Sequence, residues 1–225
     1  MPRFLAFLLL SMVSAFATDL ASLSNSEAGK GLREALAQGV GQAVGSLSAA
    51  DGFLGNPEVK IPLPPALEKV ERTLRRLGLG RHADKLVTTM NRAAESAVAE
   101  AKPILLDGIK KMTLADAKAI LAGPDDSATR FFRKTSGDAI AKKFLPKVKA
   151  ATARVKLAED YHRFAGPAAE FGLLDPKDAD LDQYIASKAV DGLFLMIANQ
   201  EKAIRADPIG QSSKLLRKVF GALRI

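Results

Sequence analysis

The sequence has no cysteine, no tryptophan and only two histidines, His82 and His162. Without cysteine the chain forms no disulfide, no thiolate metal site and no cysteine nucleophile. Two histidines are too few for a histidine-rich metal site, and both are expected to be ordinary structural or surface residues. The sequence also lacks the HExxH, GxSxG, P-loop and SxxK patterns. We therefore expect no metal and no cofactor and assign no catalytic residue, and an enzyme with an unrecognised arrangement of residues stays open as an alternative.

Aromatic residues are also scarce, at 6% of the chain, although hydrophobic residues reach 48%. Alanine and leucine dominate the hydrophobic residues, and this composition favours helices over sheets. A mature chain of about 200 residues is long enough to bury one sizeable core. We predict an all-α protein, with residues 18–225 forming a single-domain multi-helix bundle.

Residues 1–17 have the pattern of a secretory signal peptide. Arg3 supplies the positive charge, residues 4–13 are apolar apart from Ser11, and Ala15-Phe16-Ala17 is an A-x-A cleavage site. We expect cleavage after Ala17 and a periplasmic or secreted protein. The alternative is an N-terminal core helix or an uncleaved anchor. For an exported protein, no nucleic acid is expected as a partner.

An unbroken apolar run, residues 193–198, lies inside a predicted helix of about residues 180–206. At about 100° per residue, such a run points to every side of the helix axis. A helix that is apolar on all sides is one surrounded by other helices, and this run is too short to span a bilayer. We therefore predict a buried central helix, with Leu195 and Met196 shielded from water.

Periodic apolar residues and end signals predict the other helices. They cover residues 26–47, 65–77, 81–112 with an interruption at Pro103, 114–121, 127–136, 138–165 and 212–222. Thr113 with Asp116 forms a capping box, and the acids Asp125 and Asp126 precede the helix that begins at Ser127, near the positive end of its dipole.

A proline-containing segment at about residues 53–65, called the strap below, interrupts the helices. Each proline excludes its predecessor from the helical region, so this segment is predicted to be extended. We expect Phe53, Leu54, Ile61 and Leu63 to attach it to the bundle. The strap either closes the core or covers a groove.

Positive charge is concentrated in one part of the chain. The net charge is +8, and residues 130–156 hold nine lysines and arginines against one acid, Asp138. Such a block suits an anionic membrane surface or an acidic partner, or is only a solvated face. The predicted face comprises Lys142, Lys143, Lys147, Lys149, Arg154, Lys156 and Arg163.

A few polar residues stand beside apolar helical segments without an evident capping role. They are Asn91, Arg92, Tyr184, Asn199, Glu201 and Arg205. If their side chains converge, they form a polar mouth over an apolar interior, which is the general form of a small-ligand pocket. The alternative is a set of hydrogen bonds between helices with an Arg–Glu pair that fixes their packing.

Several short stretches resemble one uncharacterised bacterial family, catalogued as domain of unknown function 4197. They are Asp51-Gly52-Phe53-Leu54, residues 59–64 and 90–95, Met112-Thr113, Gly192-Leu193-Phe194, and residues 204–208 and 218–221. Where many relatives are similar to D-A-A-T, this chain has Asp126-Ser127-Ala128-Thr129. The resemblance runs from about Leu23 to the C-terminus. It implies an exported, all-helical bacterial protein without an assigned activity, and it carries no catalytic residue to this chain.

Three hypotheses about function follow. The first is a non-enzymatic binding module for a hydrophobic or lipid-like small molecule or for the anionic membrane surface. The second is a structural or interaction protein of the bacterial envelope, whose basic face meets an acidic protein or polysaccharide. The third is the enzyme with an unrecognised site.

Overall fold

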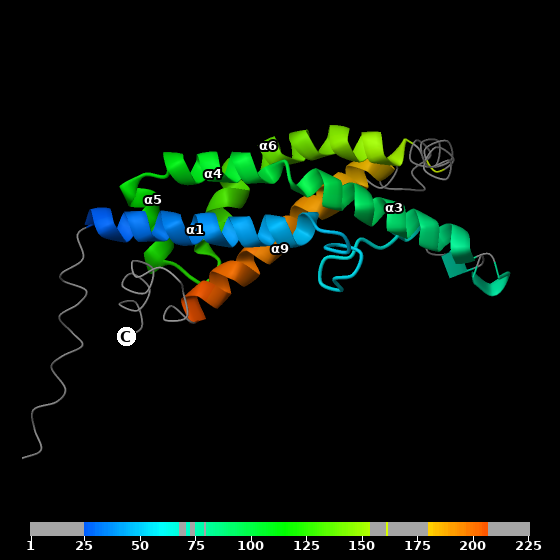
Figure 1. The fold of residues 1–225 in the computed structure, drawn as a ribbon, viewed down its shortest axis with the longest axis horizontal. Helices are drawn as coiled ribbons and strands as arrows, with labels where there is room; N and C mark the ends of the chain where they lie inside the picture. The colour runs from blue at the N-terminus through cyan, green and yellow to red at the C-terminus, as the bar shows by residue number, and fades with distance from the viewer. Residues whose placement is uncertain are drawn as a thin grey trace, which may run out of the picture.

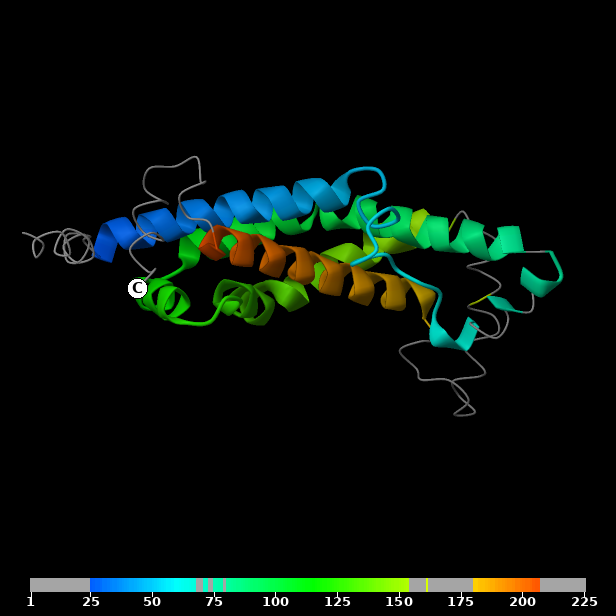
Figure 2. The same cartoon turned by 90° about the horizontal axis from the view of Figure 1, so that it is seen from below.

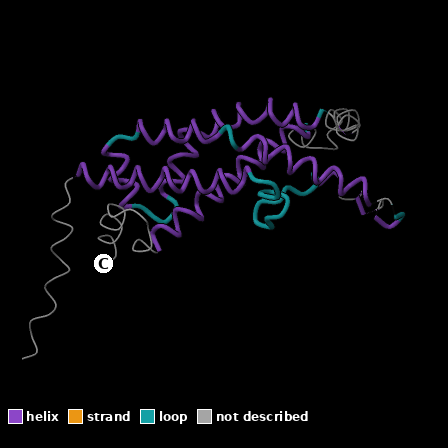
Figure 3. Tube along the Cα trace, in the orientation of Figure 1, coloured by secondary structure: helices purple, strands orange, loops and turns teal. Residues whose placement is uncertain are grey.

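The computed structural model describes residues 25–67, 71–72, 75–78, 80–153, 161 and 180–206. Within these ranges every regular element is a helix, and Figure 3 shows no strand among them. The all-α prediction is therefore confirmed. The predicted signal peptide, the C-terminal part of the basic helix apart from Tyr161, and the last predicted helix lie outside the described residues.

The described elements are helices that pack against one another (Figure 1). Their bounds are α1 (Asn25–Ser48), the 3-10 turn η1 (Pro65–Leu67), α3 (Gly80–Val98), α4 (Ala101–Lys111), α5 (Leu114–Ala122), α6 (Ser127–Thr152) and α9 (Leu181–Ala206). The capping box of α5 is present: Asp116 N donates to Thr113 Oγ1 over 3.1 Å, and Thr113 N donates to Asp116 Oδ2 over 2.9 Å. The Thr113 hydroxyl also donates to Asp116 Oδ2 over 2.7 Å. This hydrogen bond, followed by the one from Thr113 N, lowers the pKa of Asp116.

Helix α9 is the central helix, because it packs against α6, α1 and α3 (Figures 1 and 2). Leu193, Phe194 and Ile197 from the apolar run are buried. The prediction that water is excluded on every side is wrong, however, since Leu195 is 41% exposed and Met196 is only partly buried. The three neighbours leave one side of α9 uncovered, and Asp191 and Leu195 lie on that side.

Two predicted helix boundaries differ from the structure. The helix predicted for residues 81–112 is interrupted as expected, but the interruption lies at residues 99–100 rather than at Pro103. Pro103 lies in the first turn of α4, where a missing N–H removes no helical hydrogen bond. The predicted helices 127–136 and 138–165 are instead continuous through Ser136 and Gly137, because tertiary contacts hold this stretch. Ser136 is buried there, and a Cβ added at Gly137 would lie 4.0 Å from the Phe194 ring.

The buried residues of α6 recur at every fourth position. They include Ala128, Phe132, Ser136, Ile140, Phe144, Val148 and Thr152. A four-residue step turns the buried stripe by about 40° around the helix axis. Along its length α6 therefore turns different sides to its neighbours, and it packs against α9, α3 and α4. At its end, Thr152 donates a hydrogen bond to Asp182 of α9.

The strap runs between α1 and η1 and contains no helix or strand. Residues 53–55 and 57–59 form turns rather than the extended conformation predicted, with backbone hydrogen bonds from Asn56 N to Phe53 O and from Val59 N to Asn56 O. Residues 60–64 contain no turn. Phe53, Ile61 and Leu63 are buried and Leu54 is half-buried, which confirms that these apolar residues attach the strap to the bundle. Val59, which is not among the predicted residues, is buried as well. A Cβ added at Gly192 of α9 would lie 2.8 Å from Phe53 Cε1 and 3.3 Å from Val59 Cβ. The strap thus lies so close to α9 that only glycine fits there.

Replacing Gly192 by alanine is expected to destabilise the protein by about 1 to 2 kcal/mol, because overpacking against the strap outweighs the gain in helix propensity. The matched change, Gly41→Ala in α1, meets no atom within 4 Å. It should stabilise by about 0.5 to 1 kcal/mol. Urea unfolding of both variants measures the difference, and equal effects would contradict the close contact at Gly192.

Candidate functional site

Asn91 of α3 binds the backbone of the strap at Ile61. Its Oδ1 accepts a hydrogen bond from Ile61 N over 2.8 Å, and its Nδ2 donates to Ile61 O over 2.9 Å. The same Nδ2 donates to Val87 O over 2.8 Å. Asn91 is fully buried. Because buried backbone groups need partners, the Asn91 amide takes the place of a neighbouring strand for this extended residue.

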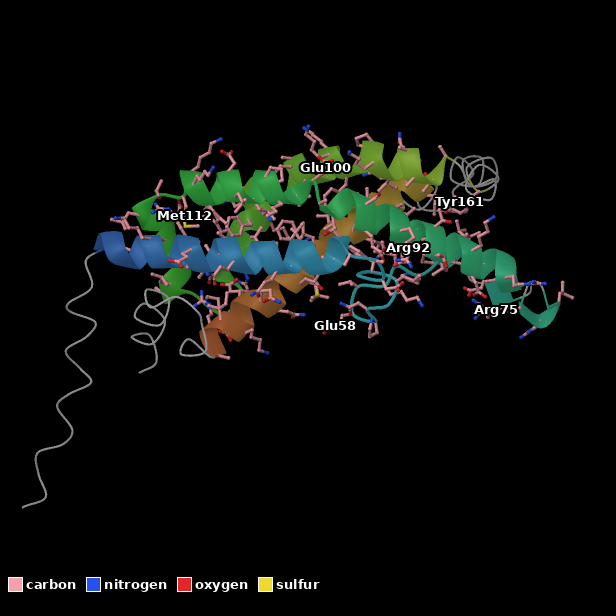
Figure 4. All side chains as sticks on the ribbon, viewed as in Figure 1. Glu58, Arg75, Arg92, Glu100, Met112 and Tyr161 are labelled. Atoms are coloured by element: carbon pink, nitrogen blue, oxygen red, sulfur yellow. The ribbon has the colours of Figure 1, made fainter. Side chains whose placement is uncertain are left out.

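Glu95, one turn further along α3, binds the other end of the strap. Its Oε1 accepts hydrogen bonds from Phe53 N and Leu54 N, each over 3.1 Å. Arg92 donates to Glu95 Oε2 and to Asp51 Oδ1, each over 2.7 Å. These bonds, led by the one to Glu95, raise the pKa of Arg92. Figure 4 marks Arg92 where α3 meets the strap.

Helix α9 contacts the strap from a second side. Tyr184 OH donates to Pro62 O over 3.3 Å, and Asn199 Nδ2 donates to Glu58 Oε2 over 3.3 Å. Two long helices therefore hold the strap through side-chain atoms. The hydrophobic contacts of Phe53 and Val59 with Gly192 lie between these polar ones.

Glu201 and Arg205 of α9 act elsewhere, at the start of α6. Glu201 is buried, and its carboxylate accepts hydrogen bonds from Ala128 N over 3.0 Å and from Thr129 N and Oγ1 over 2.9 Å. Arg205 Nη2 donates to Glu201 over 3.0 Å and to Ile120 O of α5 over 2.8 Å. The negative charge at this helix N-terminus is favourable. Asp126, the N-cap residue, makes no side-chain cap bond, so Glu201 supplies the cap of α6.

The structure does not bring the six predicted ligand-binding residues together. Asn91, Arg92, Tyr184 and Asn199 lie along the strap, whereas Glu201 and Arg205 lie at the junction of α5 and α6. Tyr184 and Arg205 are about 31 Å apart along α9 at 1.5 Å per residue. Each of the six makes hydrogen bonds within the protein, as described above. Ligand binding by these residues stays a prediction.

Two hollows lie beside these residues. A shallow groove of about 240 Å³ runs between residues 58–62 of the strap and Lys188, Asp191, Gly192 and Leu195 of α9. None of the six predicted residues lines it. A crevice of about 10 Å³ between α1 and α9 is lined in part by Glu201 and Arg205. This crevice is no larger than the space that one water molecule needs.

The basic face is described for α6 alone. Lys142, Lys143, Lys147 and Lys149 are exposed. Lys147 Nζ lies 2.9 Å from Glu100 Oε1 and lowers the pKa of that carboxyl group. No ion pair is recorded for the other three lysines in the described part of the chain. Arg154, Lys156 and Arg163 lie outside the described residues.

Two further features are absent from the ranges that the structure describes. No group of three or more acids and histidines gathers there in a way that could hold a metal ion. No helix in those ranges has both the length and the apolar composition needed to cross a membrane.

A family model described as "Protein of unknown function (DUF4197)" matches residues 22–221. The chain belongs to this family. The matched range contains every helix described above together with the strap. No curated protein and no solved structure matches the chain.

Glu95 binds the strap, but it is not among the site residues predicted from the sequence. It lies four residues after Asn91 and therefore on the same side of α3, among the buried Ala94, Ala97 and Val98. Two features of the sequence could have indicated its role. Asn91 and Glu95 form a polar pair on a buried, alanine-rich side of a helix, and the proline-containing strap needs hydrogen-bond partners for its backbone. The groove between the strap and α9 is not predicted from the sequence either, because the apolar run predicts that Leu195, which lines the groove, is buried.

We expect Asn91→Ala to lower the free energy of unfolding of this DUF4197 protein by about 2 to 4 kcal/mol, because it leaves the Ile61 N–H and C=O buried without partners. The control, Asn199→Ala, removes an exposed hydrogen bond and should change stability by less than about 0.5 kcal/mol. Urea unfolding compares the two variants. A similar small effect for both would show that Asn91 does not hold the strap.

Proposed function

We propose that this DUF4197 protein is a non-enzymatic module that binds an anionic membrane surface through the exposed lysines of α6. The observation that carries the proposal is that Lys142 and Lys149 are exposed and form no ion pair with another described residue. The two residues are seven positions apart, so their side chains leave the same side of the helix about 10 Å from each other.

The composition of this side of α6 supports a lipid surface. No acid occurs between residues 139 and 153. Pro146 is exposed between the lysines, and Ala139 and Ala150 are exposed on either side of them, so few bulky groups stand beside the lysines. Lysine stems can lie along an apolar boundary while their ammonium groups reach lipid phosphates. Each lysine near an anionic surface contributes about 1 kcal/mol to binding.

Binding at the surface has more support than a ligand held between the helices. The six polar residues predicted to line an interior site are hydrogen-bonded to the strap and to helix ends. The groove beside the strap is shallow, and the crevice at Glu201 is too small for a lipid-like molecule. Export through the predicted signal peptide, which is part of the proposal, would bring the lysines to a membrane outside the cytoplasm.

The double variant Lys142→Gln/Lys149→Gln is expected to bind vesicles containing phosphatidylglycerol about 30-fold more weakly at low salt, because two contributions of about 1 kcal/mol are lost. Vesicle co-sedimentation measures the partitioning. Added salt should weaken binding of the unchanged protein, since counterions screen exposed charges.

The control is Lys110→Gln/Lys118→Gln, which removes the same charge from exposed lysines on α4 and α5. It should bind nearly as well as the unchanged protein. Equal loss in both double variants, or equal binding to phosphatidylcholine vesicles, would contradict a site on α6. Binding to an acidic polysaccharide but not to vesicles would favour an envelope interaction protein instead.

A further inference from the structure

One end of the molecule carries an exposed leucine among arginines. The described residues 71–72 and 75–78, together with the start of α3, form the end that projects beyond the other described elements (Figures 1 and 2). Leu77 is 67% exposed there, compared with 43% for Leu114 and 41% for Leu195. It is the most exposed large hydrophobic side chain among the described residues. This part of the molecule, with Leu77 and its neighbouring arginines, is called the tip below.

The turn that presents Leu77 is fixed by named contacts. Arg75 binds Glu71 Oε1 over 2.7 Å and Asp84 Oδ1 over 2.7 Å, which joins the segment to α3 (Figure 4). Gly78 has a φ of +75° and donates a backbone hydrogen bond to Arg75 O over 3.1 Å. This left-handed conformation favours glycine. Leu77 is therefore held outward by its backbone.

The charges around Leu77 are almost all positive. Arg72, Arg76 and Arg81 are exposed, and no ion pair is recorded for them in the described ranges. The two acids of residues 71–84 are both bound to Arg75. The tip therefore has three arginines free to bind an anion next to one apolar side chain.

A single exposed leucine is common on protein surfaces and says little by itself. The combination with three unpaired arginines is more specific, because guanidinium groups bind phosphate in a bidentate manner and an apolar side chain enters the acyl boundary below the phosphates. An acidic protein would satisfy the arginines but would not by itself offer an apolar layer to Leu77. Charge and exposure together favour an anionic phospholipid bilayer.

We propose that the tip is a membrane anchor, in which Leu77 enters the headgroup boundary of an anionic bilayer while Arg72, Arg76 and Arg81 bind lipid phosphates. This inference rests on the proposed function and adds the point at which the protein enters the membrane. The C-terminal end of α6, with Lys149 in its last turn, points toward the same end of the molecule as the start of α3 in both views (Figures 1 and 2). The lysines of α6 and the tip can thus approach one membrane from that end.

The absence of tryptophan makes a direct test available. Two variants of the full-length protein, as purified from the cells that express it, are compared. One is Leu77→Trp. The other, the control, is Leu114→Trp, at an exposed leucine on α5 near the opposite end of the molecule (Figure 1). With phosphatidylglycerol vesicles, we expect a blue shift of Trp emission and quenching by brominated lipid for Leu77→Trp alone. Phosphatidylcholine vesicles should change neither spectrum.

A second set of variants measures the contribution of each group. Leu77→Ser should weaken partitioning on the order of tenfold, from the lost burial of one leucine. The triple change Arg72→Gln/Arg76→Gln/Arg81→Gln should weaken it about 100-fold. These side chains are exposed, so the variants are expected to fold, and circular dichroism with urea unfolding verifies this.

The outcomes separate this inference from the proposed function. If both Trp variants co-sediment with anionic vesicles, Leu77→Trp emission does not shift and Lys142→Gln/Lys149→Gln binds more weakly, the anchor is overturned and the binding through α6 stands. If Leu77→Trp shifts while Lys142→Gln/Lys149→Gln binds unchanged, the anchor stands and the role of α6 is overturned. If the unchanged protein binds no anionic vesicle, both are overturned.

Discussion

Backbone groups that are buried in a segment without regular structure must find hydrogen-bond partners, and this requirement governs the strap and the helices around it. Asn91 supplies a donor and an acceptor to Ile61, and Glu95 accepts from Phe53 and Leu54. Both side chains come from α3, while Gly192 of α9 leaves room for the strap on the other side. The strap therefore fixes the position of α3 relative to α9. These contacts use up the polar side chains that would otherwise suggest a ligand pocket.

The start of α6 is held on the same principle, with a buried carboxylate that accepts from two consecutive backbone N–H groups. Glu201 binds Ala128 and Thr129, and Arg205 joins this carboxylate to the end of α5. Because the inward polar groups serve the fold, the charges left for a partner lie on the outside. They include the lysines of α6 and the arginines around Leu77, and these two groups motivate the two membrane proposals.

Features with a local cause could be predicted from the sequence, whereas those that depend on distant contacts could not. Short-range chemistry predicts the capping box of Thr113 and Asp116, and it predicts that Ile61 anchors the strap. Both predictions are confirmed. The continuity of α6 through Ser136 and Gly137 depends on packing against other helices, and weak local propensity gave the wrong boundary. The apolar run around Leu195 could not reveal how many neighbours surround it. Nor could spacing pair Glu201 with a helix end 72 residues away in sequence. The predicted site residues stand out in the sequence because capping does not explain them, but the sequence does not show their partners. Asn91, Tyr184 and Glu201 bind backbone atoms of distant segments, whereas Arg92 and Asn199 bind carboxylates.

Amide hydrogen exchange at Ile61 tests most directly whether side chains of α3 hold the strap. If they do, the Ile61 N–H, bound to Asn91, exchanges as slowly as the amide of Met90 in the core of α3, because both open only when the bundle opens. The Glu58 N–H, exposed and bound to a side chain of its own turn, should exchange much faster. If Ile61 exchanged as fast as Glu58 while α3 stayed protected, the strap would open independently of the bundle, and the side chains of α3 would not hold it.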